Sequence, residues 1–309
     1  MSGNLRFISE EEVRQQLDLH ELMATMQAAL IELSAGKVTQ PLRGVISIPE
    51  HRGWFGLMPA VYRDVIGVKL VTVFPGNVSS SLDTHQALIQ LFDSATGVPL
   101  AVLDGRLITA WRTAAVSALA TRELAAPDAR VLAILGSGVQ ARTHLAMLRL
   151  VRDFDEVRVW SRTAENAHRF ADEAGAIAMS ATEAVGGADV IVTATHSSEP
   201  VLRGDWLNPR AHVNAVGAVG LQARELDAEA MRRGAVIVES REAAIHESGD
   251  IVQADVAIYA ELGEILAGKR PKPQTQLTVY KSLGVAVEDV AAARMIYKKM
   301  SGLPTNFGL

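Results

Sequence analysis

Cysteine is absent from the 309 residues of this chain, which excludes disulfides, thiol nucleophiles and cysteine-ligated metals. Aromatic residues make up only 5%, and we place them in the core or an interface rather than on a stacking platform for bases. Eight histidines are present, but none stands in a His-x-x-x-His or His-Glu-x-x-His arrangement. We therefore expect no metal site.

Positive charge is also scarce. Thirty lysines and arginines stand against 35 acidic residues, which gives a net charge of −5, and no long basic cluster occurs. This argues against nucleic acid or an anionic membrane surface as a partner. No run of about 18 apolar residues occurs, and the first residues lack the basic-then-apolar order of a signal peptide. We expect a soluble, cytoplasmic protein.

The pattern of predicted secondary structure changes once along the chain, and a length of 309 residues already favours two domains. Residues 45–103 alternate short β-rich stretches with turn signals, which predicts a mostly antiparallel sheet with a few helices. From Ala114 onwards, short apolar strands alternate with helical patterns, which predicts an α/β fold with a parallel sheet. Its strands are expected at Val131–Leu135, Val157–Trp160, Val190–Ala194, His212–Val216 and Val236–Glu239.

Helix signals are clearest near the start of the chain. Ser9 stands three residues before Glu12, and Asp18 three before Glu21, both with the spacing of a capping box. Apolar residues over positions 19–33 fall on one helical face. Further helices are expected at about residues 114–124, 139–151, 258–267 and 285–300.

The strongest local motif is Gly136-x-Gly138-x-x-Ala141, which follows an apolar strand and opens a helix. The first glycine permits a tight turn, and the second lets the backbone approach a pyrophosphate. The small third residue allows close helix–strand packing, while the helix N-terminus supplies N–H groups to phosphate. In this βαβ context the motif predicts a dinucleotide site, with a merely structural turn as the alternative.

The end of the next strand distinguishes between cofactors. NAD enzymes usually place an acidic residue there to bind the ribose hydroxyls. This chain has Trp160-Ser161-Arg162-Thr163 instead, and Arg162 with its two hydroxyl neighbours could hold a 2′-phosphate. The pattern favours NADP(H), with NAD(H) possible. The alternative for Arg162 is a solvated arginine at a helix start.

A series of short motifs runs in order over almost the whole chain. They are Gly67-Val68-Lys69, Phe74-Pro75-Gly76-Asn77, Thr84-His85-Gln86, Arg112-Thr113-Ala114-Ala115-Val116-Ser117-Ala118, Asn214-Ala215-Val216-Gly217, Glu225-Leu226-Asp227, Glu247-Ser248-Gly249-Asp250 and Tyr280-Lys281-Ser282-Leu283-Gly284. With the glycine motif, they resemble the ornithine cyclodeaminase/mu-crystallin family. The resemblance implies a homodimer. It also implies a Rossmann domain of residues 114–284 inserted in an α+β substrate-binding and dimerisation domain of residues 1–113 and 285–309.

The resemblance also assigns roles by position. Arg43, Lys69 and Arg112 match residues that bind the substrate carboxylate and orient the substrate, and their charges suit a small anionic imino or amino acid. Lys69 and Arg112 are the catalytic candidates. Lys69 has a further role open to it, because a partly buried lysine has a lowered pKa and can donate a proton. Without the resemblance, each would be read as a surface cation. Trp54 is a further candidate for the substrate pocket, with a core position as the alternative.

The cofactor contacts implied by the resemblance and by the glycine motif form a larger set. They are Thr84, Arg112, Gly136, Gly138, Val139, Gln140, Ser161, Arg162, Thr163, Thr195, Val216 and Ser282. His85 either faces the pocket or caps a local element.

One position departs from the cyclodeaminases. Those enzymes carry an aspartate two residues beyond the glycine that matches Gly217, where this chain has Val219, which cannot move a proton. Imine-reducing members of the family also lack that aspartate. The resemblance therefore favours an NAD(P)H-dependent reductase of C=N bonds alpha to a carboxylate, acting on pyrroline-2-carboxylate, piperideine-2-carboxylate or an imino acid. The alternatives are an ornithine cyclodeaminase, an alanine or other amino-acid dehydrogenase, and a non-catalytic NADP-binding protein.

Overall fold

The computed structural model of this chain describes residues 5–274 and 277–305. Two compact units divide the chain: unit 1 comprises residues 1–112 and 285–309, and unit 2 comprises residues 113–284. The sequence placed the first boundary one residue later and the second at the same position. Within the described ranges, no helix combines the length and the apolar character needed to span a bilayer.

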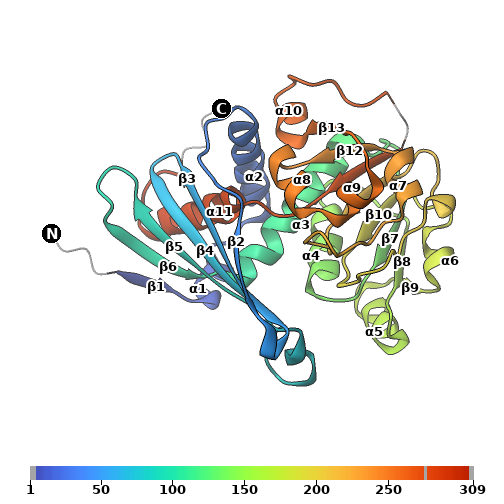
Figure 1. Ribbon diagram of the computed structural model, residues 1–309, viewed down its shortest axis with the longest axis horizontal. Helices are drawn as coiled ribbons and strands as arrows, with labels where there is room; N and C mark the ends of the chain where they lie inside the picture. Colours follow the sequence, from blue (N-terminus) through green and yellow to red (C-terminus); the bar gives the residue numbers. More distant parts are fainter. Residues whose placement is uncertain (1–4, 275–276, 306–309) are drawn as a thin grey trace. The chain divides into compact units, whose positions relative to one another are not determined.

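Unit 1 is built on a six-stranded sheet in the order β1-β6-β5-β4-β3-β2. Neighbouring strands are antiparallel except β1 and β6, which are parallel. The expected antiparallel sheet is thus confirmed (Figure 1). The strands are β1 (Arg6–Ile8), β2 (Gly44–Ile48), β3 (Gly53–Tyr62), β4 (Val65–Val73), β5 (His85–Asp93) and β6 (Pro99–Asp104).

The helices of unit 1 begin where the sequence predicts. Ser9 accepts from the Glu12 N–H, and the Glu12 side chain accepts from the Ser9 N–H at 2.9 Å, a complete capping box. Asp18 accepts from the Glu21 N–H at 2.8 Å. The helices are α1 (Glu10–Gln16), α2 (Leu19–Ser34), the start of α3 (Arg106–Leu124) and α11 (Ala286–Met300), with 3-10 turns η1 (Pro49–His51) and η2 (Pro75–Ser79).

Helix α11 packs on β3, β4 and β5, and α2 packs on α11. Residues 286–296 of α11 are all buried, as the alanine-rich sequence of this helix allows. A Cβ atom at Gly67 would lie 2.6 Å from Val290 Cγ2, so only glycine lets the helix lie this close to β4. The Gln40 side chain accepts from the Val287 N–H at 2.9 Å and caps the first turn of α11.

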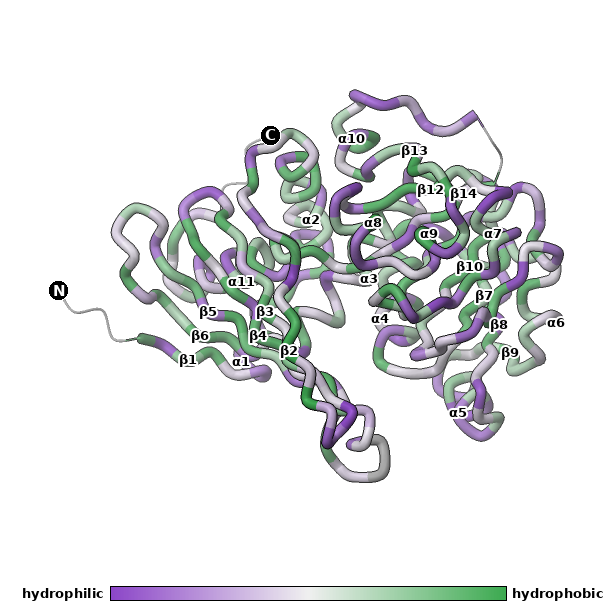
Figure 2. The backbone as a smooth tube through the Cα atoms, viewed as in Figure 1, coloured by the Kyte–Doolittle hydropathy of each residue, from purple (hydrophilic) through white to green (hydrophobic). Residues whose placement is uncertain are grey.

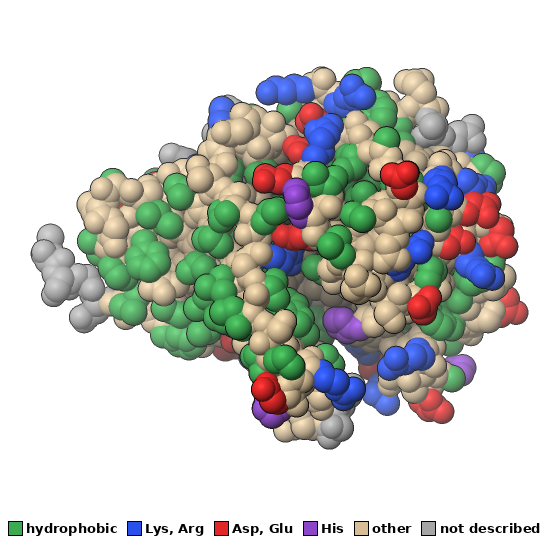
Figure 3. All heavy atoms as spheres, in the orientation of Figure 1, with side chains coloured by type: hydrophobic (Ala, Val, Ile, Leu, Met, Phe, Trp, Pro, Cys, Tyr) green, Lys and Arg blue, Asp and Glu red, His purple; other side chains and the backbone are tan. Residues whose placement is uncertain are grey.

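The opposite face of this sheet is apolar and partly exposed. Leu57, Leu70 and Leu88 are neighbours across β3, β4 and β5, and they point away from the face that Lys69 and Met58 share. Leu57 and Leu70 are half-buried, and Leu88 is exposed. Hydrophobic side chains gather over this part of the molecule in Figure 3.

Unit 2 is built on an eight-stranded parallel sheet in the order β13-β12-β14-β11-β10-β7-β8-β9, as expected. From β7 the chain runs outwards to β8 and β9 on one side, and then to β10 and β11 on the other, so the topological switch point lies between β7 and β10. The last strand, β14, lies between β11 and β12. The central strands are buried and hydrophobic along most of their length (Figure 2). The strands are β7 (Val131–Leu135), β8 (Glu156–Trp160), β9 (Ile177–Ala178), β10 (Val190–Thr193), β11 (His212–Ala215), β12 (Ala235–Val238), β13 (Ile258–Glu261) and β14 (Thr278–Lys281).

Helices alternate with these strands along the chain. After the remainder of α3, they are α4 (Val139–Leu148), α5 (Ala164–Ala174), α6 (Ala181–Val185), η3 (Gly204–Trp206), α7 (Ala228–Arg233), α8 (Arg241–Glu247), α9 (Gly249–Ala254) and α10 (Leu262–Leu266). Parallel strands joined through helices make this unit a Rossmann-type domain.

Two helix predictions need correction. The helix expected at residues 258–267 is wrong in its first part, because residues 258–261 form strand β13 and pair with β12. Glu261 ends that strand and opens α10, with its N–H donating to the Glu264 carboxylate at 2.8 Å. Helix α3 begins at Arg106 rather than near Ala114. In the first case a tertiary strand pairing overrode the local helical pattern.

Candidate functional site

Lys69 lies on β4 with its side chain on the helix-covered face of the unit 1 sheet. Its register neighbours are Met58 and Ile89, and only 2% of the residue is exposed. Burial in this apolar setting lowers the pKa of Lys69 to about 8, against an opposing pull from Asp289. The Lys69 Nζ lies 2.5 Å from Asp289 Oδ2 on α11.

Arg112 completes a buried cluster with the same aspartate. Its Nε donates to Asp289 Oδ1 at 3.0 Å and its Nη1 to Glu288 Oε2 at 2.5 Å. The Thr109 hydroxyl also donates to Asp289 Oδ1, at 3.4 Å. Asp289 therefore bridges Lys69 and Arg112, and two contacts hold the guanidinium plane in one orientation.

Opposite charges keep this cluster ionised. Burial pushes the pKa of Asp289 upwards, but the positive charges of Arg112 and Lys69 outweigh it, and the pKa is lowered. The charges of Arg112 and Arg43 both add to the lowering of the Lys69 pKa. Arg43 and Arg112 thus both act electrostatically on Lys69, although they lie 69 positions apart in the sequence.

The sequence did not single out Glu288 and Asp289. Acidic residues in the first turn of a helix are common, because they complement the helix dipole, so the pair carries no distinctive local signal. Full burial beside Lys69 and Arg112 is what marks it. Only a search for carboxylates able to neutralise two buried cations could have pointed to it.

Trp54 and Thr84 belong to the same unit. Trp54 lies on β3, half-buried, and its ring covers Gly56, where an added Cβ would lie 2.8 Å from Trp54 Cζ3. Thr84 precedes β5, and its carbonyl accepts from the Phe74 N–H at 2.8 Å. His85 begins β5 opposite Val73. Apart from Arg112, the other expected cofactor positions lie in unit 2.

The glycine turn of unit 2 has the geometry that a pyrophosphate needs. Gly136 has a φ of 132°, and a Cβ there would lie 2.4 Å from the Ala194 carbonyl oxygen, so only glycine fits. Gly138 is exposed, with no atom within 4 Å of an added Cβ, and no side chain caps α4. Open space above an uncapped helix N-terminus fits a bound phosphate group. Val139 and Gln140 form the first turn of that helix.

Ser161, Arg162 and Thr163 directly follow β8, as expected. The Ser161 hydroxyl lies 2.9 Å from the Ser137 hydroxyl in the glycine turn, so the two segments are joined. Arg162 and Thr163 are exposed. Arg142, which the sequence did not single out, donates to the Ser137 carbonyl and pairs with Glu173 at 2.5 Å, so it supports the turn from α4.

The remaining expected contacts lie at the carboxyl ends of β10, β11 and β14. Ligands of open α/β sheets bind at this edge. The Thr195 hydroxyl donates to Glu225 at 2.7 Å, and the Ser282 hydroxyl to Glu239 at 2.8 Å. Val216 is buried. Across the described residues, no three histidine, aspartate or glutamate side chains gather as metal ligands do.

Known proteins that resemble this chain include reductases that act on C=N bonds. The family model described as the ornithine cyclodeaminase/mu-crystallin family matches residues 5–303. The chain belongs to this family. It is 46% identical over 304 residues to the ketimine reductase mu-crystallin of Mus musculus, covering 96% of this chain and 97% of that protein.

Two solved structures extend the comparison. The Delta(1)-pyrroline-2-carboxylate reductase of Thermococcus litoralis, in complex with NADH and L-proline, is 35% identical, with a TM-score of 0.90 over 98% of this chain and 100% of that one. An archaeal alanine dehydrogenase dimer with bound NAD is 30% identical, with a TM-score of 0.90 over 96% of each chain.

Proposed function

We propose that this chain is an NAD(P)H-dependent reductase of C=N bonds alpha to a carboxylate. Its substrates would be cyclic ketimines, such as pyrroline-2-carboxylate and piperideine-2-carboxylate, or a related imino acid. The observation that carries the proposal is the buried Lys69–Asp289–Arg112 cluster, present in the same chain as an open glycine turn for a dinucleotide. The names of the ketimine reductase and pyrroline-2-carboxylate reductase relatives support it.

In this reaction the chain's own residues would handle the proton and the carboxylate. When bound, the reduced nicotinamide would supply a hydride, which is a proton with two electrons, to the imine carbon, and a second proton must reach the nitrogen to complete the amine. With a pKa of about 8, Lys69 is protonated at neutral pH yet releases its proton far more readily than an ordinary lysine. Asp289 orients the ammonium. Arg43 and Arg112 would attract the substrate carboxylate.

Unit 2 would hold the cofactor. Gly136 and Gly138, with the first turn of α4, would receive the pyrophosphate, and Ser161, Arg162 and Thr163 a 2′-phosphate. This arrangement favours NADP(H), with NAD(H) possible. Thr84, Thr195, Val216 and Ser282 would complete the cofactor contacts, and Trp54 would line the substrate side.

The proposal includes a homodimer formed through the apolar face of the unit 1 sheet. The Leu57–Leu70–Leu88 row forms a partly exposed apolar surface, and such surfaces can mark a subunit contact. Leu70→Arg should shift the sedimentation coefficient from dimer to monomer, and a dimer that persists would remove this face from the contact. A cytoplasmic location remains a prediction from the sequence.

One assay separates the candidate functions. Purified protein is mixed with NADPH or NADH and a panel of cyclic imino acids, or 2-oxo acids with ammonia, and the absorbance of the reduced cofactor is followed. Oxidation of cofactor by a cyclic imino acid is the expected result. Ammonia release from ornithine without net cofactor change would instead indicate a cyclodeaminase, against which the uncharged Val219 argues. Preferred turnover of pyruvate with ammonia would indicate an alanine dehydrogenase. Tight cofactor binding without turnover would indicate a binding protein.

A further inference from the structure

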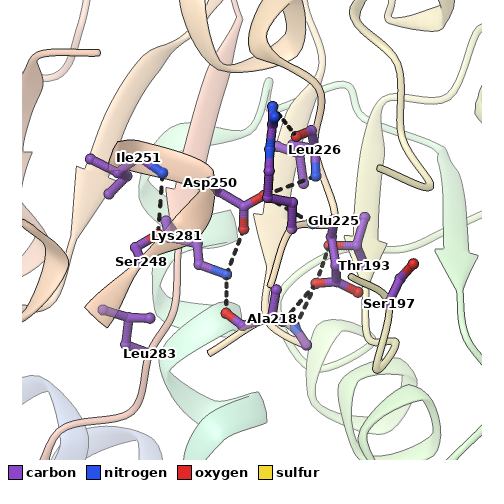
Figure 4. A network of polar contacts seen from close by, with 12 residues as sticks. Thr193, Ser197, Ala218, Glu225, Leu226, Ser248, Asp250, Ile251, Lys281 and Leu283 are labelled. Atoms are coloured by element: carbon purple, nitrogen blue, oxygen red, sulfur yellow. Dashed lines mark hydrogen bonds and ion pairs between the residues drawn. The ribbon is translucent and has the colours of Figure 1, made fainter. Parts of the chain in front are cut away.

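Unit 2 contains a closed ring of buried polar contacts that the proposed reaction does not use directly (Figure 4). Lys281, the last residue of β14, donates from Nζ to the Ala218 carbonyl at 2.7 Å. The same Nζ lies 3.0 Å from Asp250 Oδ2 in α9. Neither the Lys281 nor the Asp250 side chain has any exposed surface. The ammonium therefore links a carboxylate to one particular backbone carbonyl.

The ring closes through Glu225. Asp250 Oδ1 accepts from the N–H groups of Glu225 and Leu226 at 2.9 and 3.0 Å. The Glu225 carboxylate in turn accepts from the Gly217 N–H at 2.6 Å and from the Ala218 N–H at 3.2 Å. Its other oxygen accepts from the Thr195 N–H at 2.6 Å, which adds the segment after β10. Both backbone groups of Ala218 are thus held by members of the ring.

The segment held in this way is residues 217–220, which only Val216 separates from the end of β11. On its far side, the Gly220 N–H donates to the Glu247 carbonyl at 2.7 Å, and the Gly220 carbonyl accepts from the Gly249 N–H at 3.2 Å. Val219 stands between two anchored residues and is 37% exposed. A Cβ at Gly217 would lie 2.1 Å from the Thr195 carbonyl oxygen, so the segments after β10 and β11 are packed backbone to backbone.

A buried ion pair is an expensive way to satisfy one carbonyl, because both charges lose their hydration. Water or a backbone N–H could bond to the Ala218 carbonyl at far smaller cost. What the ammonium adds is a fixed distance between β14, α9 and the end of β11. These elements meet at the carboxyl edge of the sheet, where a ligand of this fold binds.

We propose that Lys281 is a positioning residue of the reductase site, which acts through the Ala218 carbonyl and Asp250 to fix residues 217–220 at the edge of the sheet that receives the cofactor. This rests on the proposed function. Lys281 touches neither cofactor nor substrate in this account. The chemistry requires it because a displacement of about 1 Å in a positioning segment can lower turnover by about a hundred-fold.

The first arm of the test needs no turnover. Amide hydrogen exchange is measured in the wild type, in Lys281→Met, and in a Lys281→Met/Asp250→Asn double variant that leaves no unpaired charge. We expect exchange at Gly217, Ala218 and Gly220 to be about ten-fold faster in both variants, with α5 unchanged. The matched control is Lys272→Met, which removes a lysine of the same unit that is 60% exposed. Unchanged exchange over residues 217–220 would overturn the anchoring role.

The second arm compares kinetics with cofactor affinity, the latter followed by the fluorescence of bound NADPH. In the double variant we expect kcat to fall about ten-fold or more, with KM for the imine within about three-fold. Lys281→Arg should recover part of the loss, because a guanidinium can still reach a carbonyl and a carboxylate. A double variant with near wild-type kcat would contradict the positioning role. So would a kcat that returns to the wild-type value when the thermal midpoint of unfolding does, because Lys281 would then only stabilise the fold. A wild type that reduces no imine would refute the proposed function, and the exchange arm would still decide whether Lys281 anchors the segment.

Discussion

Two buried lysine–aspartate pairs, one in each unit, share the same local arrangement. Lys69 and Asp289 pair in unit 1, Lys281 and Asp250 in unit 2, and in each the Oδ2 atom faces the ammonium. The Oδ1 atom in each takes two further donors. In unit 1 these are a guanidinium and a hydroxyl, and in unit 2 they are two backbone N–H groups.

The two pairs differ in the other groups that contact the lysine and the aspartate, and this difference suits unit 1 to proton transfer and unit 2 to holding the backbone. Arg112 places a second positive charge beside Lys69, which adds to burial in lowering the lysine pKa to about 8. Lys281 instead donates to a backbone carbonyl, and its aspartate binds backbone amides, so the pair is built into the main chain. In the proposed roles, the same two residue types would hold a proton ready for transfer in unit 1 and hold a loop in place in unit 2.

The largest effect is expected from Lys69→Met. If Lys69 supplies the proton, kcat for imine reduction should fall by about 10² to 10⁴. Cofactor affinity should stay near the wild-type value, because the glycine turn lies in the other unit. Stopped-flow turnover and a fluorescence titration with NADPH measure the two quantities. A variant that keeps its full rate would place Lys69 outside the mechanism and end the contrast between the pairs.

Lys281→Met should show its largest effect on stability. Removing the ammonium leaves the Asp250 carboxylate buried without a cation, which costs about 3–5 kcal/mol in the free energy of unfolding. Urea denaturation followed by circular dichroism measures it. Lys69→Met should cost clearly less, because Asp289 keeps Arg112 and Thr109 as donors. Equal losses in the two variants would show that the second partners do not matter.

Arg162→Ala tests unit 2 alone. If Arg162 binds the 2′-phosphate, KM for NADPH should rise about ten- to a hundred-fold, because a charge-assisted hydrogen bond is lost. KM for NADH should change little, since that cofactor has no phosphate at this position. Parallel changes with both cofactors would instead mean that Arg162 acts through the fold of the turn.

The pH dependence gives the smallest effect. If Lys69 supplies the proton, its protonated form is the active one, so kcat/KM should be level below about pH 8 and fall about ten-fold per pH unit above it. Lys69→Arg should lack this descending limb, because a guanidinium does not titrate in the range. The free energy of unfolding should move the other way. Since the lysine pKa falls from 10.5 to about 8 on folding, the unfolded chain binds more protons between those values, and this residue's contribution to stability rises with pH.

The sequence by itself determined the features that depend on neighbouring residues. The Ser9–Glu12 capping box, the apolar strand before Gly136 and the alternation of strands and helices are all set within about one element's length. Gly136 could be recognised from the glycine motif that follows this strand. The structure adds the reason for a glycine there, because its backbone angle and the close approach of Ala194 leave room for no side chain. Lys69 and Arg112 were proposed as site residues through motifs that resemble those of the family.

Only the tertiary structure decided what those residues contact. Asp289 reaches Arg112 across 177 positions of sequence, and Lys281 reaches Ala218 across 63. The strand at residues 258–261 likewise exists because β12 lies beside it. Such pairings depend on how helices and sheets pack over the whole unit, whereas local spacing reflects only the periodicity of one segment. Burial strengthens the electrostatic effect of these pairings, because water no longer screens the charges. A guanidinium or a backbone amide beside the aspartate can then change the properties of the paired lysine.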